Sequence, residues 1–369
     1  MLTRRTLLAS AAATAGLAGC ATVSPALASA GPGRGPWKHS TPEAHGLSLA
    51  ALEAAAAQLA APGERQGLVV IRHGELVFER YWANAWARAV PEWRNVSFSA
   101  GKSWGGAMVG RAVTLGRLDI DDLTSKYHPA EVSGFRRQTR IRHLLTMTSG
   151  GTMNMKPSSK PPKKLDDTTP PGPGVEYEWY KEAERGAPPG YGLTIQPGDR
   201  FFYDGAPADH LADIISAVAG KSSHRFMMED VVAPLGCENF NYQPEGVDTK
   251  DNIRIGGSIT LSCRDMARLG QLYLNHGSWG GEQLIDKNYI RDAVNPSAHN
   301  PAYGYLWWLN RSGRTPGAPR SMYFAAGARG QFCFVLPEHD MVIATMGFGQ
   351  AQLSAPDAWK ALGPILPAV

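Results

Sequence analysis

The chain has 369 residues, a length that allows a large hydrophobic core and two lobes. Hydrophobic residues make up 43% and charged residues 19%, which is typical of a globular protein and excludes a disordered or fibrous one. The net charge of +4 is slight and no basic stripe with interleaved aromatic residues is present, so we expect no nucleic-acid partner.

Residues 1–30 are predicted to be an export signal and are excluded from the fold. An Arg4-Arg5 pair, which is compatible with the twin-arginine route, precedes an apolar run over 7–18. The stretch 17–20, Leu-Ala-Gly-Cys, is similar to a bacterial lipobox, in which Cys20 is lipidated and tethers the chain to a membrane. Cleavage after Ala28 or Ala30 is the alternative and gives a soluble exported form. Both place the protein in the periplasm or cell envelope.

Residues 31–45 are rich in Gly and Pro and are predicted to be a tether. Residues 46–95 form the first part of an α/β lobe: a helix over 47–59, then a β-hairpin of strands 67–72 and 75–81 with Gly74 in its turn. After the N-terminal segment, nothing along the chain is long and apolar enough to span a bilayer.

A Ser-x-x-Lys sequence, Ser99 to Lys102, opens a predicted buried helix over 100–118, with Ser97 as its N-cap. Positions i and i+3 share a helix face, so the Ser99 hydroxyl lies within reach of the Lys102 amine. A lysine among apolar residues loses hydration, which favours its neutral, proton-accepting form. The pair therefore predicts a nucleophile with its base, and no metal or cofactor is expected. A chance occurrence of the spacing on a small-residue packing helix is the alternative.

Residues 96–290 are predicted to be a mostly helical lobe with a loop insertion over 151–200. Its helices are expected over 141–150, 207–219, 224–232 and 262–275. Within the insertion, Tyr177, Trp179 and Tyr180 form either a lid over a pocket or anchors that hold the loop to the body. Three cysteines remain after Cys20, an odd number without metal-ligand spacing, so buried free thiols are expected at 237, 263 and 333. The alternative is one disulfide between two of them, and the sequence does not assign which two.

Residues 291–369 complete the α/β lobe with strands over 303–309, 322–328, 331–336 and 341–346, a turn over 337–340 and a closing helix over 353–362. The order of strands, helices and strands contains no alternating βαβ units. It therefore predicts an α+β fold in which an antiparallel sheet flanked by helices shares the chain with a mostly helical lobe.

Between residues 41 and 349 the chain resembles the serine β-lactamase and penicillin-binding-protein family, in particular its class C-like branch of esterases and 6-aminohexanoate-dimer hydrolases. The resemblance rests on the order and spacing of six stretches: 98–103 (FSAGKS), 141–150 (IRHLLTMTSG), 196–205 (QPGDRFFYDG), 262–270 (SCRDMARLG), 303–308 (YGYLWW) and 327–331 (GARGQ). It implies a β-lactamase/transpeptidase-like fold.

The resemblance also implies roles. Ser99 matches the acylated serine, Lys102 its partner, and Tyr203 the tyrosine that shares the proton transfer; the backbone N–H groups of Ser99 and Ala328 match the oxyanion hole. A phenol acts as a base at neutral pH only beside a cation, which Lys102 supplies, so the two titrate as a pair. Substrate-binding positions are expected at Gly205, Ala326, Gly327, Arg329 and Trp179.

Two departures from the family pattern bear on substrate. Ala325 and Ala326 stand where the family carries Lys-Thr or His-Thr, and Gly205 where it usually has asparagine. His143 is expected to be structural, and Asp204 to cap the helix that follows it.

The leading hypothesis is an exported serine hydrolase of small esters or uncharged amides, with no protein partner indicated. A β-lactamase or D-Ala-D-Ala peptidase is the first alternative. A catalytically silent, ligand-binding lipoprotein on the same fold is the second, and the presence of Ser99, Lys102 and Tyr203 together argues against it.

Overall fold

A six-stranded antiparallel sheet forms one side of the molecule in the computed structural model, which describes residues 31–85, 87–153, 191–348 and 353–367. The strand order is β2-β1-β11-β10-β9-β8. The two ends of the chain thus meet in one sheet, since β1 pairs with β11. The strands are β1 (Arg65–Arg72), β2 (Glu75–Tyr81), β8 (Trp308–Leu309), β9 (Tyr323–Gly327), β10 (Gln331–Leu336) and β11 (Met341–Gly347).

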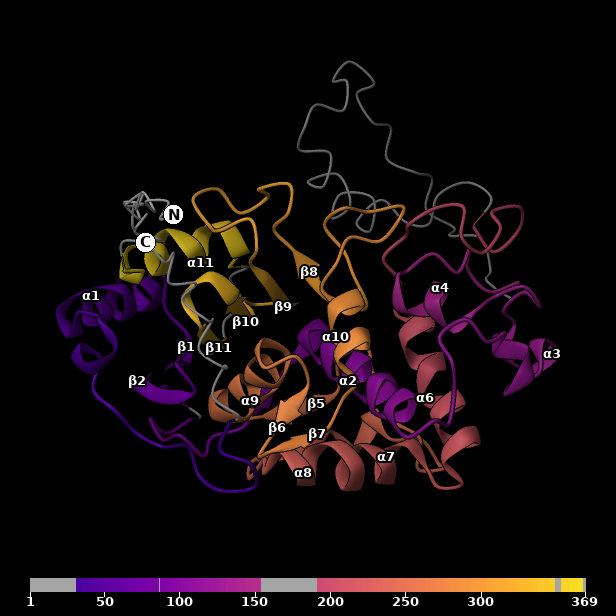
Figure 1. Cartoon of the computed structure of the whole chain (residues 1–369), viewed down its shortest axis with the longest axis horizontal. Helices are drawn as coiled ribbons and strands as arrows, with labels where there is room; N and C mark the ends of the chain where they lie inside the picture. The colour runs from indigo at the N-terminus through magenta and orange to yellow at the C-terminus, as the bar shows by residue number, and fades with distance from the viewer. Residues whose placement is uncertain (1–30, 86, 154–190, 349–352, 368–369) are drawn as a thin grey trace, which may run out of the picture.

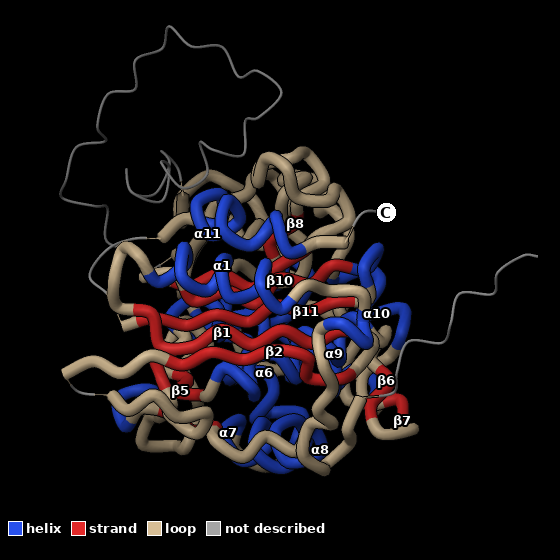
Figure 2. Tube along the Cα trace, turned by 90° about the vertical axis from the view of Figure 1, so that its left-hand side faces the viewer, coloured by secondary structure: helices blue, strands red, loops and turns tan. Residues whose placement is uncertain are grey.

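Both faces of this sheet are covered, which explains why its central strands are apolar without alternation. On one face, Phe334 packs against Trp359 of α11 (Ala355–Leu362), beside α1 (Leu49–Ala60) (Figure 2). On the other, the Cys333 thiol donates to the carbonyl of Met266 in α9 (Cys263–Leu274). The side chains of successive residues in β10 therefore pack alternately against the helices on one face of the sheet and on the other.

The second lobe is helical and lies beside the sheet (Figure 1). Its central helix, α2 (Gly101–Thr114), is buried along most of its length and contacts α6 (Ala206–Ala219). Around them lie α3 (Ala130–Ser133), α4 (Ile141–Leu145), α7 (Ser223–Phe226), a π-helical stretch (Met227–Val232), α8 (Ala233–Leu235) and α10 (Lys287–Ala293). Two small antiparallel sheets complete the lobe: β3 (Asn95–Val96), β5 (Ile259–Leu261) and β4 (Phe240–Tyr242); and β6 (Ser278–Trp279) with β7 (Glu282–Gln283).

The glycines of α2 allow its neighbours to approach closely. A β-carbon on Gly105 would lie 2.2 Å from Ile255 Cγ2, and one on Gly110 would lie 2.6 Å from the ring of Tyr289. The helix is therefore central because its small residues leave room for the surrounding elements.

The α+β architecture agrees with the prediction, and the differences are local. The chain enters α2 through a 3₁₀ turn (Phe98–Ala100), and the Ser97 hydroxyl donates to the Phe98 carbonyl instead of capping the helix. The helix ends at Thr114, four residues before the predicted end. Of the strand predicted over 303–309 only β8 is regular, because Tyr303 bridges back to Trp308 within the same segment.

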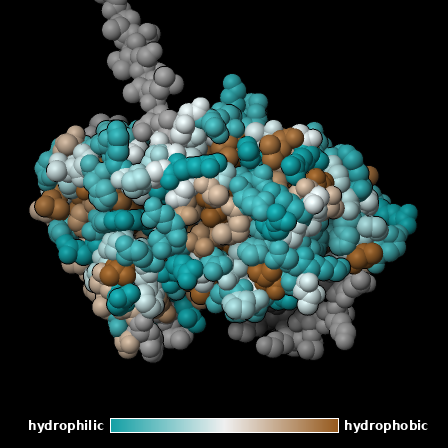
Figure 3. Space-filling view, turned by 90° about the horizontal axis from the view of Figure 1, so that it is seen from below, coloured by the Kyte–Doolittle hydropathy of each residue, from teal (hydrophilic) through white to brown (hydrophobic). Residues whose placement is uncertain are grey.

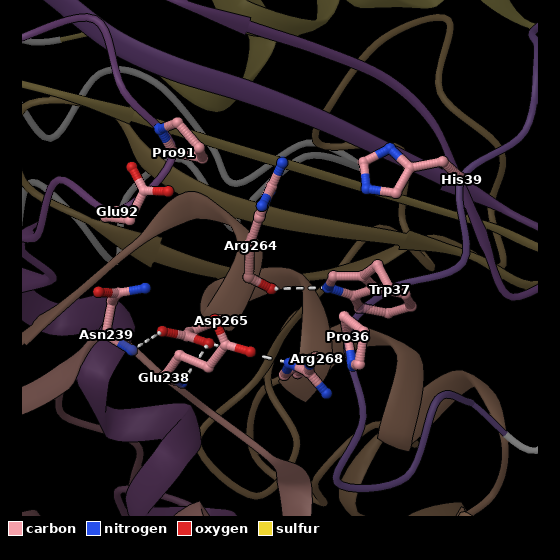
Figure 4. A pocket seen from close by; sticks show the side chains of 10 residues that line it. All are labelled: Pro36, Trp37, His39, Pro91, Glu92, Glu238, Asn239, Arg264, Asp265 and Arg268. Atoms are coloured by element: carbon pink, nitrogen blue, oxygen red, sulfur yellow. Dashed lines mark hydrogen bonds and ion pairs between the residues drawn. The ribbon is translucent and has the colours of Figure 1, made fainter.

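The segment predicted as a tether over 31–45 packs against the body for part of its length. Trp37 is 5% exposed and its indole N–H donates to the carbonyl of Arg264 at 3.4 Å (Figure 4). The guanidinium of Arg268 donates to the carbonyls of Gly33 and Gly35. A buried arginine on α9 requires acceptors, and this Gly/Pro-rich segment supplies its free backbone carbonyls.

Hydrophobic residues on the face seen in Figure 3 are scattered among hydrophilic ones. The described residues contain no helix that is long and apolar enough to cross a membrane. Cys237, Cys263 and Cys333 are free thiols, as expected.

Candidate active site

The 3₁₀ turn before α2 presents Ser99 at the junction of the two lobes. Phe98 has φ of +46°, a left-handed conformation that is rare for an aromatic residue, and it turns the chain immediately before Ser99. Ser99 is partly exposed, whereas Ala100 and Gly101 after it are buried. The turn therefore leaves the hydroxyl accessible at the start of a buried helix.

Lys102 lies one helical turn after Ser99, and the two side chains meet as the spacing predicts. The Nζ of Lys102 is 3.3 Å from Ser99 Oγ and donates to the carbonyl of Gly256 at 3.2 Å. Lys102 is only 4% exposed, so its amine is almost removed from water. The serine hydroxyl thus has a proton acceptor within reach whose position is fixed by a backbone carbonyl.

Tyr203 lies beside this pair, just before α6. The Lys102 Nζ is 5.0 Å from the centre of the Tyr203 ring. The same ring stacks on Trp308 of β8, with 5.4 Å between centroids, and meets Tyr303 edge-on. Two aromatic neighbours hold the tyrosine against the lysine, so the three residues proposed for catalysis form one cluster.

Asp209 and Gly256 belong to this cluster, although no motif in the sequence pointed to either residue. The Gly256 N–H donates to Asp209 Oδ1 at 3.0 Å, while its carbonyl accepts from Lys102. Burial raises the pKa of Asp209, and the Gly256 N–H and the Lys102 charge oppose that rise. The backbone of one residue, Gly256, therefore connects a partly buried carboxylate on α6 to the lysine.

The end of β9 lies directly against the turn that carries Ser99. A β-carbon on Gly327 would lie 2.2 Å from the Ser97 carbonyl oxygen and 3.0 Å from the Ala100 nitrogen. Only glycine allows so close an approach of the two backbones. Ala328 is exposed and is the first residue after β9. Its backbone N–H therefore lies at the end of β9 that contacts the Ser99 turn.

The remaining predicted positions divide into three groups. Ala326 is buried next to Gly327 on β9, and Gly205 precedes α6 at a place where a β-carbon would meet nothing within 4 Å. The Arg329 guanidinium stacks over the ring of Phe98 at 5.2 Å, which brings a cation to the residue beside Ser99. Trp179, the aromatic residues near it and Cys20 lie outside the described residues.

His143 has the structural role expected of it, whereas Asp204 lies one residue before the N-cap of α6, which is Gly205, so the expected capping role is not the one observed. The Nδ1 of His143 accepts from the Arg140 N–H at the start of α4, and burial together with nearby arginines lowers the pKa of His143 to about 4. Asp204 Oδ1 accepts from the N–H of Ala206, the first residue of α6. His143 also lines a cavity of about 470 Å³ between α4 and the segment after α10. Among the described residues, Ser99, Lys102 and Tyr203 do not line this cavity.

Comparisons with known proteins bear on the family and the fold of the chain. Residues 52–360 match the model of the Beta-lactamase family. The 6-aminohexanoate-dimer hydrolase of Paenarthrobacter ureafaciens is 23% identical over 304 residues, covering 75% of this chain and 71% of that protein. A penicillin-binding protein homologue from Caulobacter crescentus has a TM-score of 0.62 at 16% identity, covering 85% of this chain and 95% of its own. A family VIII carboxylesterase has a TM-score of 0.62 at 15% identity, covering 85% and 95%. These structural likenesses show the fold.

Proposed function

The chain belongs to the β-lactamase family, and on that premise we propose that it is a serine hydrolase that cleaves small esters or uncharged amides through an acyl-enzyme on Ser99. The observation that carries the proposal is the buried Lys102 amine, 3.3 Å from the Ser99 hydroxyl and against the ring of Tyr203. A protein that only bound a ligand or served as a scaffold would have no need of all three.

The reaction begins when the Lys102/Tyr203 pair accepts the Ser99 proton as Oγ bonds to the carbonyl carbon of the substrate. The carbonyl oxygen then carries a negative charge, which the N–H groups of Ser99 and Ala328 stabilise. As the tetrahedral intermediate collapses, the bond to the leaving alcohol or amine breaks and the pair returns the proton to it. Water, deprotonated by the same pair, then attacks the acyl-enzyme, and release of the acid regenerates the Ser99 hydroxyl.

The substrate class is inferred from the side chains around this cluster. Ala325 and Ala326 offer neither a charge nor a hydroxyl to a substrate carboxylate, and Gly205 leaves open space at the start of α6. A carboxylate bound there would lose its hydration without a charge-assisted hydrogen bond, typically worth about 1.5–3 kcal/mol. Uncharged esters and amides do not incur this cost. The names of the two hydrolases to which the chain is similar fit the same class.

A β-lactamase or D-Ala-D-Ala peptidase is the second candidate, and one contact favours it. The Arg329 guanidinium lies over Phe98, next to the nucleophile, where a cation could hold a substrate carboxylate. The similarity to a penicillin-binding protein homologue is compatible with this activity. Both candidates use the same nucleophile, so substrate profile separates them.

The first experiment measures acylation of Ser99 by intact mass after treatment with a fluorophosphonate and, separately, with a penicillin. We expect one adduct per chain with the fluorophosphonate and none in Ser99→Ala, which should also lower ester hydrolysis by roughly a thousandfold or more. Ser103→Ala is the matched control, because its buried hydroxyl already donates to the carbonyl of Leu306 in the segment before β8. Full activity in Ser99→Ala would end the proposal.

The second experiment compares kcat/KM for a p-nitrophenyl ester with that for nitrocefin on the same enzyme. We expect good turnover of the ester and poor turnover of nitrocefin, a selectivity of roughly ten- to a hundredfold from the missing carboxylate partner. Efficient nitrocefin hydrolysis that is lost in Arg329→Ala would instead support the second candidate.

We also propose that the protein is exported and anchored by lipid at Cys20. The support is the charged, apolar and lipobox-like order of residues 4–20. One acyl chain binds membranes only marginally, so stable anchoring requires the several chains of a bacterial lipoprotein. Cell fractionation tests this: Cys20→Ser should move the protein from the membrane to the soluble fraction, whereas a wild-type protein already soluble outside the cytoplasm would contradict the anchor.

A further inference from the structure

A second cluster of reactive side chains lies on α6, away from Ser99. His210 and Asp213 stand three residues apart on this helix, and His128 reaches them from the loop between a 3₁₀ turn (Thr124–Lys126) and α3. Their nearest ligand atoms, the two Nδ1 atoms and Asp213 Oδ2, all lie within 4.8 Å of one another. We propose that these three residues bind a divalent transition-metal ion, with zinc as the ion that fits best.

Two of the three distances within the cluster are those of ligands sharing an ion. The two Nδ1 atoms are 3.4 Å apart, and Asp213 Oδ2 is 3.5 Å from His210 Nδ1 and 4.0 Å from His128 Nδ1. Hydrogen bonds of this type have donor–acceptor distances of about 2.7–3.2 Å. By contrast, two ligands held at about 2.0–2.2 Å in a tetrahedral zinc site lie roughly 3.3–3.5 Å apart. The 4.0 Å edge is the only one that must shorten.

The orientation of the two rings agrees with a shared ion. The ring centroids are 5.0 Å apart, farther than the 3.4 Å between the Nδ1 atoms, so the rings turn these nitrogens toward each other. Phe135 stacks on His210 at 4.9 Å and fixes that ring, which is 5% exposed. A buried imidazole whose position is fixed before the ion arrives loses little freedom on binding.

The other carboxylate oxygen has a neighbour of its own. The side-chain amide of Asn252 lies 3.4 Å from Asp213 Oδ1, a long and therefore weak contact, which leaves Oδ2 directed at the histidines. The His128 and Asp213 side chains are 25% and 40% exposed, so an ion can enter and water can take a fourth position.

Other histidine clusters in the described part of the chain differ in geometry. His224 and Asp251 are 2.8 Å apart, an ordinary hydrogen bond. His45 contacts His73 through Nδ1 and Glu75 through Nε2, so its two neighbours lie on opposite sides of the ring and cannot share one ion. His73 is therefore a suitable control for a histidine pair without convergent ligands.

The metal would join the loop that carries His128 to α6. The same helix carries Asp209, which accepts from the N–H of Gly256, the residue whose carbonyl contacts Lys102. Binding to the folded state alone stabilises it in proportion to the logarithm of the ion concentration. At zinc concentrations about a hundred times the Kd, a protein of this size should gain roughly 4 °C in Tm.

The test uses the full-length chain without a histidine tag, stripped with a chelator and titrated with ZnCl₂. We expect one zinc ion per chain by equilibrium dialysis, the Tm rise above, and a visible absorption band when Co²⁺ replaces zinc. Asp213→Asn and His128→Asn should each weaken binding tenfold to a hundredfold or more and remove the band, whereas His73→Asn should leave both unchanged.

Two variants are used because His128→Asn could lose zinc binding by disturbing its loop. Asp213→Asn preserves the shape of a partly exposed side chain, so a loss of binding in this variant reports the loss of the carboxylate itself. Circular dichroism of each variant establishes that it is folded. Failure of the wild type to bind zinc below about 100 µM, or equal binding by Asp213→Asn and the wild type, would overturn the proposal and leave a purely hydrogen-bonded cluster.

Discussion

Replacing Asp209 by asparagine should shift the pH dependence of catalysis and, at neutral pH, stabilise the fold. A methyl carbon placed on Gly256 would lie 3.4 Å from Asp209 Oδ1 and 3.9 Å from Lys102 Nζ, so the two charged groups are at most about 7 Å apart. At that separation, and with an effective dielectric constant of about 20, their attraction is about 2 kcal/mol. The substitution removes this attraction while the asparagine oxygen still accepts from the Gly256 N–H.

A negative charge this close to the reacting groups opposes the removal of a proton from them. Its loss should move the acidic limb of the kcat/KM profile to lower pH by roughly one to two units, since 1.36 kcal/mol corresponds to one unit. The assay is hydrolysis of a p-nitrophenyl ester between pH 5 and 9, with Asp357→Asn, an exposed carboxylate that pairs with Lys360 on α11, as the control for a lost charge.

The stability effect follows from the direction of the pKa of Asp209. Burial raises that pKa above its unfolded value, so the favourable contribution of this group is fully present below the unfolded pKa and is lost as the pH rises through the folded one. At pH 7, above the unfolded pKa, that favourable contribution is reduced, and asparagine should therefore raise Tm. An unchanged acidic limb together with a lower Tm would refute the reasoning and make Asp209 a structural acceptor only.

Three further predictions concern packing and acid stability. Gly105→Ala should destabilise the fold by about 1–3 kcal/mol in urea unfolding, because its β-carbon would overlap the buried Ile255 side chain, at 2.2 Å from Cγ2. Gly327→Ala should reduce kcat a hundredfold or more, because a β-carbon 2.2 Å from the Ser97 oxygen would push β9 away from the Ser99 turn. His143→Gln should make the free energy of unfolding less sensitive to acid. The pKa of His143 is lowered to about 4, so the stability that comes from its neutral ring is present above pH 6.5 and is lost as the pH falls toward 4. The loss is about 1–2 kcal/mol for a partly exposed group.

Gly35→Ala is the control for both glycine variants, since its β-carbon would meet its nearest neighbour at an ordinary 3.4 Å. Wild-type stability in Gly105→Ala would mean that Ile255 can move freely, and wild-type kcat in Gly327→Ala would exclude Ala328 from the oxyanion hole. For His143→Gln, the measurement is the free energy of unfolding at pH 7 and pH 4.5. An equal loss in variant and wild type would show that other groups govern acid unfolding.

The sequence by itself determines the features that arise from neighbouring residues. Ser99 and Lys102 meet because an i,i+3 spacing places two side chains on one face of any helix, however the helix ends. The hairpin of β1 and β2 and the strands β9, β10 and β11 follow from short apolar runs separated by turn residues, and their order already indicates an α+β fold. The close packing of α2 follows from its glycines for the same local reason.

Tertiary structure alone decides which remote segments meet. Gly256 reaches Lys102 from 154 positions along the chain, and Trp37 reaches Arg264 across 227, which is why a predicted tether turns out to be packed. His128 and His210 are 82 positions apart, so no ligand spacing is visible in the sequence although their Nδ1 atoms are 3.4 Å apart. Such contacts depend on the path of every loop between them, and their energies come from burial and charge pairing that exist only once the two lobes have packed together.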